Sequence, residues 1–154
     1  IGFKSISFDK SLCKEPVKAS DGKISVLLVE PNKYPKMIEI DDTLEAMQAV
    51  VGGDIEEYMP FEDEVAIICN EEGKVNGLTP NRAVYEENSR EMLDIICGKF
   101  FVAYAPFEAE RFQSLPPDLA EKYREKFKYP ERFMRVNDEI VAVPFKPVRA
   151  DKER

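Results

Sequence analysis

Apolar residues recur at two different spacings, which divide the chain into strand-like and helix-like segments. Residues 24–30 (ISVLLVE), 65–70 (VAIICN) and 100–105 (FFVAYA) are short, rich in β-branched or aromatic side chains and apolar at nearly every position. Such runs are typical of buried strands, so we predict a strand at each, the first of them central and covered on both faces. Residues 36–40 are predicted to form a hairpin with the first strand, across the proline-containing turn 31–35.

Shorter segments predict the remaining strands. Gly53 lets the chain reverse into a strand over 54–59, and Asn70-Glu71-Glu72-Gly73 matches a type I turn that leads to a returning strand over 74–78. The segment 84–97 fits a helix or a strand and is left open. Residues 133–147 are predicted to form a hairpin that turns at Asn137-Asp138.

Two segments have the spacing of amphipathic helices. In 42–51, Leu44, Met47 and Val51 fall on one face. We expect Asp42 to cap this helix, with Glu45 in the capping-box position, and Gly52 to end it in the left-handed conformation.

The second helix is predicted over 114–128, with Ser114 as its cap and Pro116 and Pro117 in its first turn. Its apolar stripe repeats every four residues and consists of Leu115, Leu119, Tyr123 and Phe127.

Strands and helices alternate irregularly, without repeated βαβ units. The pattern predicts an α+β domain with a mixed, largely antiparallel sheet and two or three helices packed on one face. We expect one domain over 23–147, preceded by a leader or the end of an earlier segment (1–22) and followed by a charged tail (148–154).

Charge is distributed unevenly along the 154 residues, whose net charge is −8. The stretch 30–72 has thirteen acids and only two lysines, whereas 111–135 has seven bases and four acids. An acidic front half disfavours direct binding to nucleic acids or anionic membranes. No apolar run has the length that a transmembrane helix requires.

Three cysteines, Cys13, Cys69 and Cys97, are widely spaced and odd in number. This usage fits reduced thiols in a cytoplasmic protein better than a secreted disulfide framework. Cys69 and Cys97 lie in apolar runs and are predicted to be buried as small hydrophobic residues.

Several chemistries are excluded by the residues present. The chain has no histidine, which removes Ser–His and Cys–His catalysis and every His-ligated metal site. It has no CxxC pair and no glycine-rich phosphate loop. The two Ser-x-x-Lys matches, at Ser11 and Ser20, lie in the predicted leader and are attributed to chance. The sequence therefore predicts no catalytic residue, no metal and no cofactor.

One acidic run has two interpretations. Its carboxylates could bind a hard cation through oxygen ligands, or they could form a solvated face. Its members are Glu56, Glu57, Glu62, Asp63 and Glu64.

The order of several short segments resembles a known domain family. These segments are KISVLLVEP, LEAMQAVVGGDIE, ICNEEGKVNGLTPNRAVY, DIICGKFFVAYA and SLPPDLAEKYREKF, and together they cover about residues 23–128. The chain is similar to an uncharacterised family, a domain of unknown function, that is carried by phages, plasmids and integrative conjugative elements. The resemblance implies an accessory protein of a mobile element and assigns no catalytic residue.

Polar residues within these segments are the candidates for contact with a ligand or partner: Asn81, Arg82, Gln48, Glu56, Glu71, Glu72 and Lys74. The glycines of the same segments, Gly52, Gly53, Gly73, Gly77 and Gly98, are expected at structural turns. Residues 79–82 are predicted to form a loop, in which Arg82 either grips a phosphate or carboxylate or pairs with the acidic front half.

Three functions are compatible with these observations. The first is a non-catalytic module that binds an unidentified protein, which could counter a host defence. The second is an acidic mimic of DNA that inhibits a DNA enzyme, and it is supported only by the acids of 30–72. The third is a nucleotide- or small-molecule-binding protein or enzyme that uses the loop containing Asn81 and Arg82.

Overall fold

The computed structural model describes residues 22–147, so residues 1–21 of the predicted leader, Cys13 among them, and the tail 148–154 lie outside the described part. The strands are β1 (Lys23–Val29), β2 (Lys36–Asp41), β3 (Ile55–Tyr58), β4 (Val65–Asn70), β5 (Pro80–Tyr85), β6 (Met92–Cys97), β7 (Phe100–Tyr104), β8 (Glu131–Val136) and β9 (Glu139–Pro144), and the helices are α2 (Leu44–Val51) and α3 (Pro117–Lys126).

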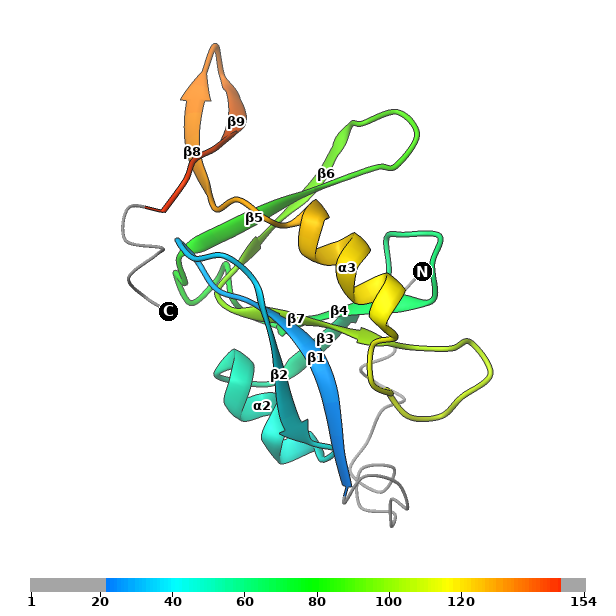
Figure 1. The fold of residues 1–154 in the computed structure, drawn as a ribbon. Helices are drawn as coiled ribbons and strands as arrows, with labels where there is room; N and C mark the ends of the chain where they lie inside the picture. Colours follow the sequence, from blue (N-terminus) through cyan, green and yellow to red (C-terminus); the bar gives the residue numbers. More distant parts are fainter. Residues whose placement is uncertain (1–21, 148–154) are drawn as a thin grey trace.

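A five-stranded sheet forms the centre of the molecule, in the order β2-β1-β7-β4-β3 (Figure 1). Each pair of neighbours in this sheet is antiparallel. The runs predicted as buried strands supply its three middle strands, β1, β7 and β4, and all six residues of β4 are buried. The α+β class and the hairpin of β1 and β2 are therefore confirmed.

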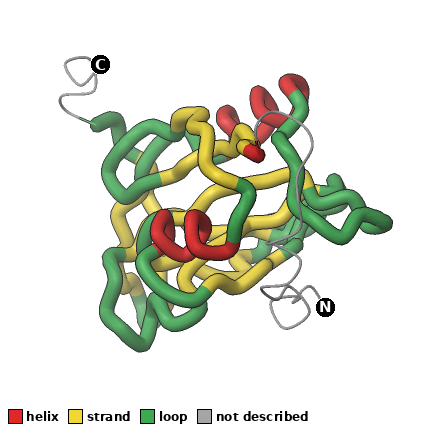
Figure 2. The backbone as a smooth tube through the Cα atoms, turned by 90° about the horizontal axis from the view of Figure 1, so that it is seen from below, coloured by secondary structure: helices red, strands yellow, loops and turns green. Residues whose placement is uncertain are grey.

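The two helices cover opposite faces of this sheet, so the prediction that helices pack on one face is wrong. Alternate residues of β4 show this: Ala66 and Ile68 pack in the cluster that contains α2, whereas Val65 and Ile67 pack in the cluster that contains α3. Figure 2, seen from below, shows one helix in front of the strands. Strands that are apolar at consecutive positions need cover on both sides, which two separate helices provide.

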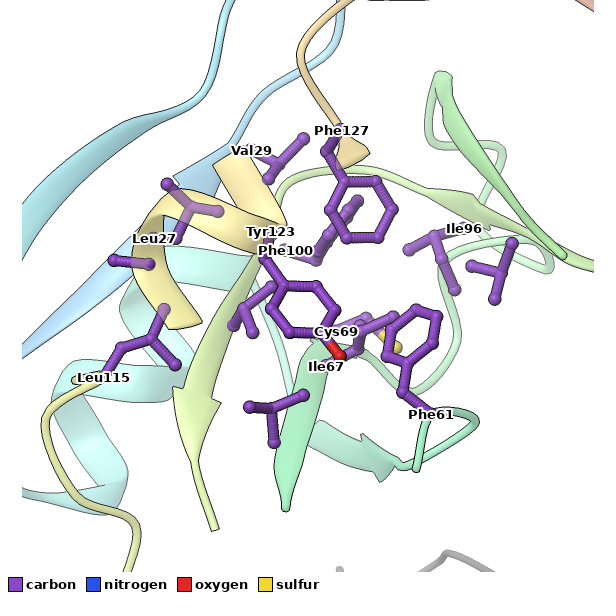
Figure 3. Close-up of a cluster of buried hydrophobic side chains, with 14 residues drawn as sticks. Leu27, Val29, Phe61, Ile67, Cys69, Ile96, Phe100, Leu115, Tyr123 and Phe127 are labelled. Carbon is purple, nitrogen blue, oxygen red and sulfur yellow. The ribbon is translucent and has the colours of Figure 1, made fainter. Parts of the chain in front are cut away.

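The α3-side cluster is rich in aromatic side chains (Figure 3). Tyr123 is fully buried at its centre, with its ring centroid 5.2 Å from that of Phe61. Phe127 contacts both Phe61 and Phe100 through edge-to-face ring pairs. The stripe predicted on the second helix is thus the face that α3 and its flanking turns bury, with Leu119 half-buried at the margin.

Both helix caps differ from the predicted ones. Thr43 caps α2, because its hydroxyl accepts a hydrogen bond from the Ala46 N–H at 3.1 Å. The buried Asp42 carboxylate instead forms an ion pair with the half-buried Arg111 at 2.8 Å. Pro116 occupies the cap position of α3, and the Ser114 hydroxyl accepts a hydrogen bond from the Ser25 N–H of β1. Asp42 and Ser114 each bind a residue far away in the sequence, which the local spacing of residues does not indicate.

The segment after β4 also departs from the prediction. The turn that begins at Asn70 is present, with the Gly73 N–H bonded to the Asn70 carbonyl at 3.2 Å. However, residues 71–77 continue as turns, so the strand expected over 74–78 is wrong. The open question at 84–97 is resolved in favour of strands, because β5 ends at Tyr85 and β6 begins at Met92.

The last hairpin, β8 and β9, projects from the body of the molecule (Figure 1). Its turn lies at Asn137-Asp138, as predicted, and both residues have positive φ angles of 52° and 69°. Positive φ at both central residues defines the type I′ turn, whose twist matches that of the flanking strands.

We predict that Ile67→Ala lowers the free energy of unfolding by about 2–5 kcal/mol, because it leaves a cavity in the α3-side cluster. Ile67 is fully buried in β4. Urea denaturation checks this, with Leu93→Ala on β6, whose side chain is 45% exposed, as the control. Equal stability of the two variants would contradict the assigned core.

Candidate functional site

Arg82, the residue predicted to grip a ligand, is buried in β5 with 1% of its surface exposed. Its Nε donates to the Phe127 carbonyl at 3.0 Å, and one Nη donates to the Lys33 carbonyl at 2.8 Å. Its other Nη donates to the side-chain oxygen of Asn81 at 2.8 Å. The predicted loop at 79–82 is therefore wrong from Pro80 onwards, and this guanidinium is committed to the protein itself.

Asn81 completes the same network. Its side-chain N–H groups donate to the Val29 carbonyl at 3.0 Å and to the Gly98 carbonyl at 2.9 Å. The two residues thus join β1, β5, the turn before β7 and the end of α3. Adjacent strand residues normally point to opposite faces, but a β-bulge between Pro80 and Arg82 accommodates two buried polar neighbours.

The charge of Arg82 is stabilised by the protein's own groups. Burial lowers the pKa of its guanidinium to about 10, and attraction to Glu131 acts in the opposite direction. The group stays protonated at neutral pH, and its acceptors are the backbone carbonyls of Phe127 and Lys33 and the side-chain oxygen of Asn81. The expected pairing with the acids of the front half is therefore wrong: from that stretch Arg82 contacts only backbone carbonyl oxygens, those of Lys33 and Glu30.

Four of the other candidates do meet, in a groove beside the 71–77 turns. Glu56, Glu71, Glu72 and Lys74 line a hollow of about 300 Å³ together with Asp94. Lys74 donates a hydrogen bond to the Asp94 carboxylate. The groove therefore combines one ion pair with three further carboxylates, which suits a positively charged group better than an anion.

The electrostatics of this groove favour protonated groups. Burial raises the pKa of Glu56, and the nearby Asp94 and Glu71 carboxylates raise it further. Burial likewise raises the pKa of the Cys69 thiol to about 12 and shifts that of Cys97 upwards. Since the thiolate is the nucleophilic form, neither cysteine is activated for covalent chemistry.

Gln48 lies outside this groove. Its amide donates to the Asp54 carboxylate at 3.0 Å, which links α2 to the chain before β3. Asp54 lines an adjoining hollow of about 260 Å³ with Gly53, Asn70, Glu72 and Asn76. Gln48 therefore has a structural partner, Asp54, and lies beside the groove that Glu56, Glu71, Glu72 and Lys74 line.

The acidic run does not form one cluster. Glu57 is buried with 2% of its surface exposed, and the Asp63 carboxylate accepts hydrogen bonds from Lys122 at 2.6 Å and Tyr123 at 2.9 Å. Glu64 accepts one from the Phe107 N–H. Among residues 22–147, no group of three acidic or thiol side chains is arranged to hold a metal ion.

The glycines of the family-like segments lie at turns, as predicted, for two different reasons. Gly52 ends α2 with φ of 82°, the left-handed conformation, and its N–H bonds the Gln48 carbonyl. At Gly73, a Cβ would lie 2.6 Å from the Cys97 carbonyl oxygen, so the turn can approach β6 only without a side chain. Gly53 faces the Asn70 amide closely, and Gly77 and Gly98 have positive φ.

A larger groove lies beside β5 and was not found by sequence reasoning. Its volume is about 500 Å³, and its lining comes from β5, the loop 86–90, the end of α3 and the first residue of β8. The residues concerned are scattered over seventy positions, from Phe61 to Glu131. No local pattern marks such a site, because tertiary packing brings its walls together.

The projecting hairpin presents apolar side chains whose exposure was not predicted. Met134, Val136, Ile140, Val141 and Val143 are each between 37% and 46% exposed. A scattered exposed apolar residue is ordinary, but a contiguous group on one element is a feature of interaction surfaces.

The described part of the chain also contains no helix that is long and apolar enough to cross a membrane.

Comparison with known proteins gives one finding. A family model described as a domain of unknown function, DUF3846, matches residues 24–128. The matched range holds the sheet, both helices and the buried Arg82, whereas β8 and β9 follow it. No curated protein and no solved structure matches the chain.

We predict that Arg82→Lys lowers the free energy of unfolding by about 2–4 kcal/mol, because an ammonium group cannot reach the Phe127 and Lys33 carbonyls together and leaves buried acceptors unpaired. Urea denaturation at neutral pH measures this. Lys33→Ala is the matched control, since the acceptor at residue 33 is a backbone carbonyl that this change retains. Equal stability of Arg82→Lys and the control would contradict the structural role.

We predict that Glu56→Gln flattens the dependence of stability on pH above pH 4.5. The folded-state pKa of Glu56 is raised, so its contribution to stability is fully present below 4.5 and is lost as the pH rises through the raised pKa. Urea denaturation at several pH values between 4 and 7 measures the profile. Glu45→Gln, an exposed change on α2, is the control, and a profile unaltered by Glu56→Gln would contradict the assignment.

Proposed function

We propose a function on the premise that the chain belongs to the DUF3846 family of domains of unknown function. In this proposal, the chain is a non-catalytic binding module of a mobile genetic element. It acts in the cytoplasm by contact with a host protein and so counters a host defence. The contact element is the β8–β9 hairpin. The observation that carries this proposal is the solvent-exposed apolar face of that hairpin.

The pairing register defines this face. Met134 lies opposite Val141 and Val136 opposite Glu139, so their side chains point to the same side. Val143 joins them opposite Arg132. Met134, Val136, Val141 and Val143 therefore form one apolar strip, which we call the hairpin strip, with a charged residue at each end.

The hairpin is anchored at its root, which fixes the place of the strip. The Glu131 carboxylate accepts a hydrogen bond from the Ala83 N–H at 2.8 Å, and the Phe145 N–H donates to the Pro130 carbonyl at 2.9 Å. The Arg132 guanidinium stacks 4.3 Å from the centre of the Phe145 ring. A two-stranded hairpin is marginally stable alone, and burial of its apolar face by a partner would stabilise it further.

The other two functions have less support. A DNA mimic needs its acids on one surface, but Asp42 and Glu57 are buried and Asp63 is engaged by α3. A nucleotide site at Asn81 and Arg82 lacks a free guanidinium, because both side chains hold the fold together.

We predict that Met134→Arg/Val141→Arg reduces the yield of a captured host protein roughly tenfold or more, because two charges would be buried at the centre of the contact. The measurement is affinity capture from a bacterial host lysate with the tagged 154-residue chain. Circular dichroism and thermal unfolding confirm that the variant is folded.

Phe107→Arg is the matched control, because Phe107 is an exposed apolar residue (64%) in the loop between β7 and α3. It should capture the same protein at the yield of the unmodified chain. Equal capture by the hairpin variant, or no captured protein at micromolar bait, would refute the proposed function.

A further inference from the structure

The outer edge of β9 is open in the described part of the chain. Among residues 22–147, β9 pairs only with β8, and the hairpin that the two strands form stands clear of the other elements (Figure 1). The pairing runs without a bulge from the Glu131–Pro144 pair to the Val136–Glu139 pair. A strand with one open edge presents backbone N–H and C=O groups that can pair with an added strand.

The backbone groups on this edge can be assigned. The Phe145 N–H donates to the Pro130 carbonyl at 2.9 Å, so these residues form a hydrogen-bonded pair at the root of the hairpin. Hydrogen-bonded and non-hydrogen-bonded pairs alternate along an antiparallel ladder. Val141 therefore directs its N–H and C=O towards β8, whereas Ile140 and Ala142 each direct theirs outwards.

The edge lacks the features that usually protect an edge strand. Natural edge strands are commonly protected by lysine, by proline or by a bulge. β9 (EIVAVP) has no lysine, its one proline is its last residue, and its register with β8 is regular. Ile140 and Val141 are 44% and 37% exposed, and β-branched residues of this kind favour strand pairing. The edge is therefore suited to accept a further strand.

The edge is complementary to itself. When two copies of β9 lie antiparallel about a twofold axis at Val141, Ile140 of each copy lies opposite Ala142 of the other. Both residues direct their backbone groups outwards, so each of these pairs can exchange both of its hydrogen bonds. A register shifted by two residues would place Ile140 opposite Pro144, which has no N–H to donate.

The charged side chains also fit this register. Residues directly opposite each other project from the same face of a sheet. Glu139 of one copy lies opposite Val143 of the other, and Arg132 is the β8 neighbour of that Val143. Opposite charges therefore share a row, two strands apart, and no two like charges lie opposite each other across the junction. This charge complementarity favours a second copy as the added strand.

We propose that the outer edge of β9 binds the same edge of a second copy of this chain, so that the two hairpins form one four-stranded antiparallel sheet. A two-stranded hairpin is marginally stable alone, and a sheet of more strands removes that weakness. The hairpin strips of the two copies then lie side by side on one face and stay open. The inference concerns the strand edge and not the strip, so it does not depend on the proposed function.

The first test is sedimentation velocity with the 154-residue chain. So short an interface is small for a protein complex, so we expect a dissociation constant of roughly 10–100 μM and a monomer–dimer shift across that range. Ala142→Pro removes an outward N–H without touching a bond to β8, and it should weaken dimerisation at least about tenfold.

Arg135→Pro is the matched control. The Arg135 N–H points outwards from the opposite edge of the hairpin, on β8, because Arg135 pairs with Ile140. The control therefore loses the same kind of group and should dimerise like the unmodified chain. Circular dichroism and thermal unfolding confirm that both variants are folded.

A second test reads the register, in a Cys13→Ser background with glutathione disulfide as the oxidant. In the proposed dimer, Val141 faces its own counterpart in a non-hydrogen-bonded pair, with Cα atoms about 4.5 Å apart, which suits a disulfide. Val141→Cys should therefore give a covalent dimer: the two thiols lose two electrons and two protons, which reduce glutathione disulfide to two thiols. Val143→Cys should not, because its two copies lie four residues out of register, roughly 13 Å apart.

Several outcomes would overturn the inference: a monomer at every concentration up to about 500 μM, equal dimerisation of the two proline variants, or equal crosslinking of the two cysteine variants. Pairing of β9 with the chain's own terminal segments would appear as the first of these. No host protein enters either test, so failure here is distinct from failure of the proposed function.

Discussion

The buried guanidinium of Arg82 is the constraint on which the arrangement of the molecule depends. A charge with 1% of its surface exposed is tolerated only if acceptors surround it, and here they are carbonyl oxygens from the β1–β2 turn and the end of α3. Asn81 adds bonds to β1 and to the turn before β7. Arg82 and Asn81 can form all these hydrogen bonds only when every one of these segments is in place. The network therefore couples the β5–β6 sheet and α3 to the central sheet.

The positions of the large groove and of the β8–β9 hairpin both depend on this coupling. The bond between Arg82 and the Phe127 carbonyl sets the distance between β5 and the end of α3, which form the floor and one wall of the large groove. The chain then reaches Glu131, whose carboxylate bonds the Ala83 N–H and begins the hairpin. A change at Arg82 would therefore disturb binding indirectly, through the fold, although the residue is no part of either surface.

Sequence reasoning recovered features with a local or periodic cause. The three buried strands, the apolar stripe of α3 and the turn at Asn137-Asp138 are set by spacing and turn chemistry, and each is found in the structure. It failed where a polar side chain has a distant partner, as for Asp42 with Arg111 and for Arg82. The large groove could not be predicted, because packing between segments far apart in the sequence produces it. The exposure of the hairpin strip could not be predicted either, because the apolar pattern of 133–147 does not show that no described segment covers it.

The fold places the acidic and the basic segments of the chain beside different grooves. The basic segment 111–135 supplies α3 and the start of the hairpin, beside the large groove. Carboxylates of the acidic stretch line the groove of about 300 Å³ beside the ends of β4 and β6. Acids nevertheless outnumber bases in the lining of both grooves, since Glu86, Glu87 and Glu131 face only Arg90 and Lys126 in the large one, so both grooves repel an acidic partner. Electrostatics would then select the orientation, and the apolar hairpin strip would supply the free energy of contact.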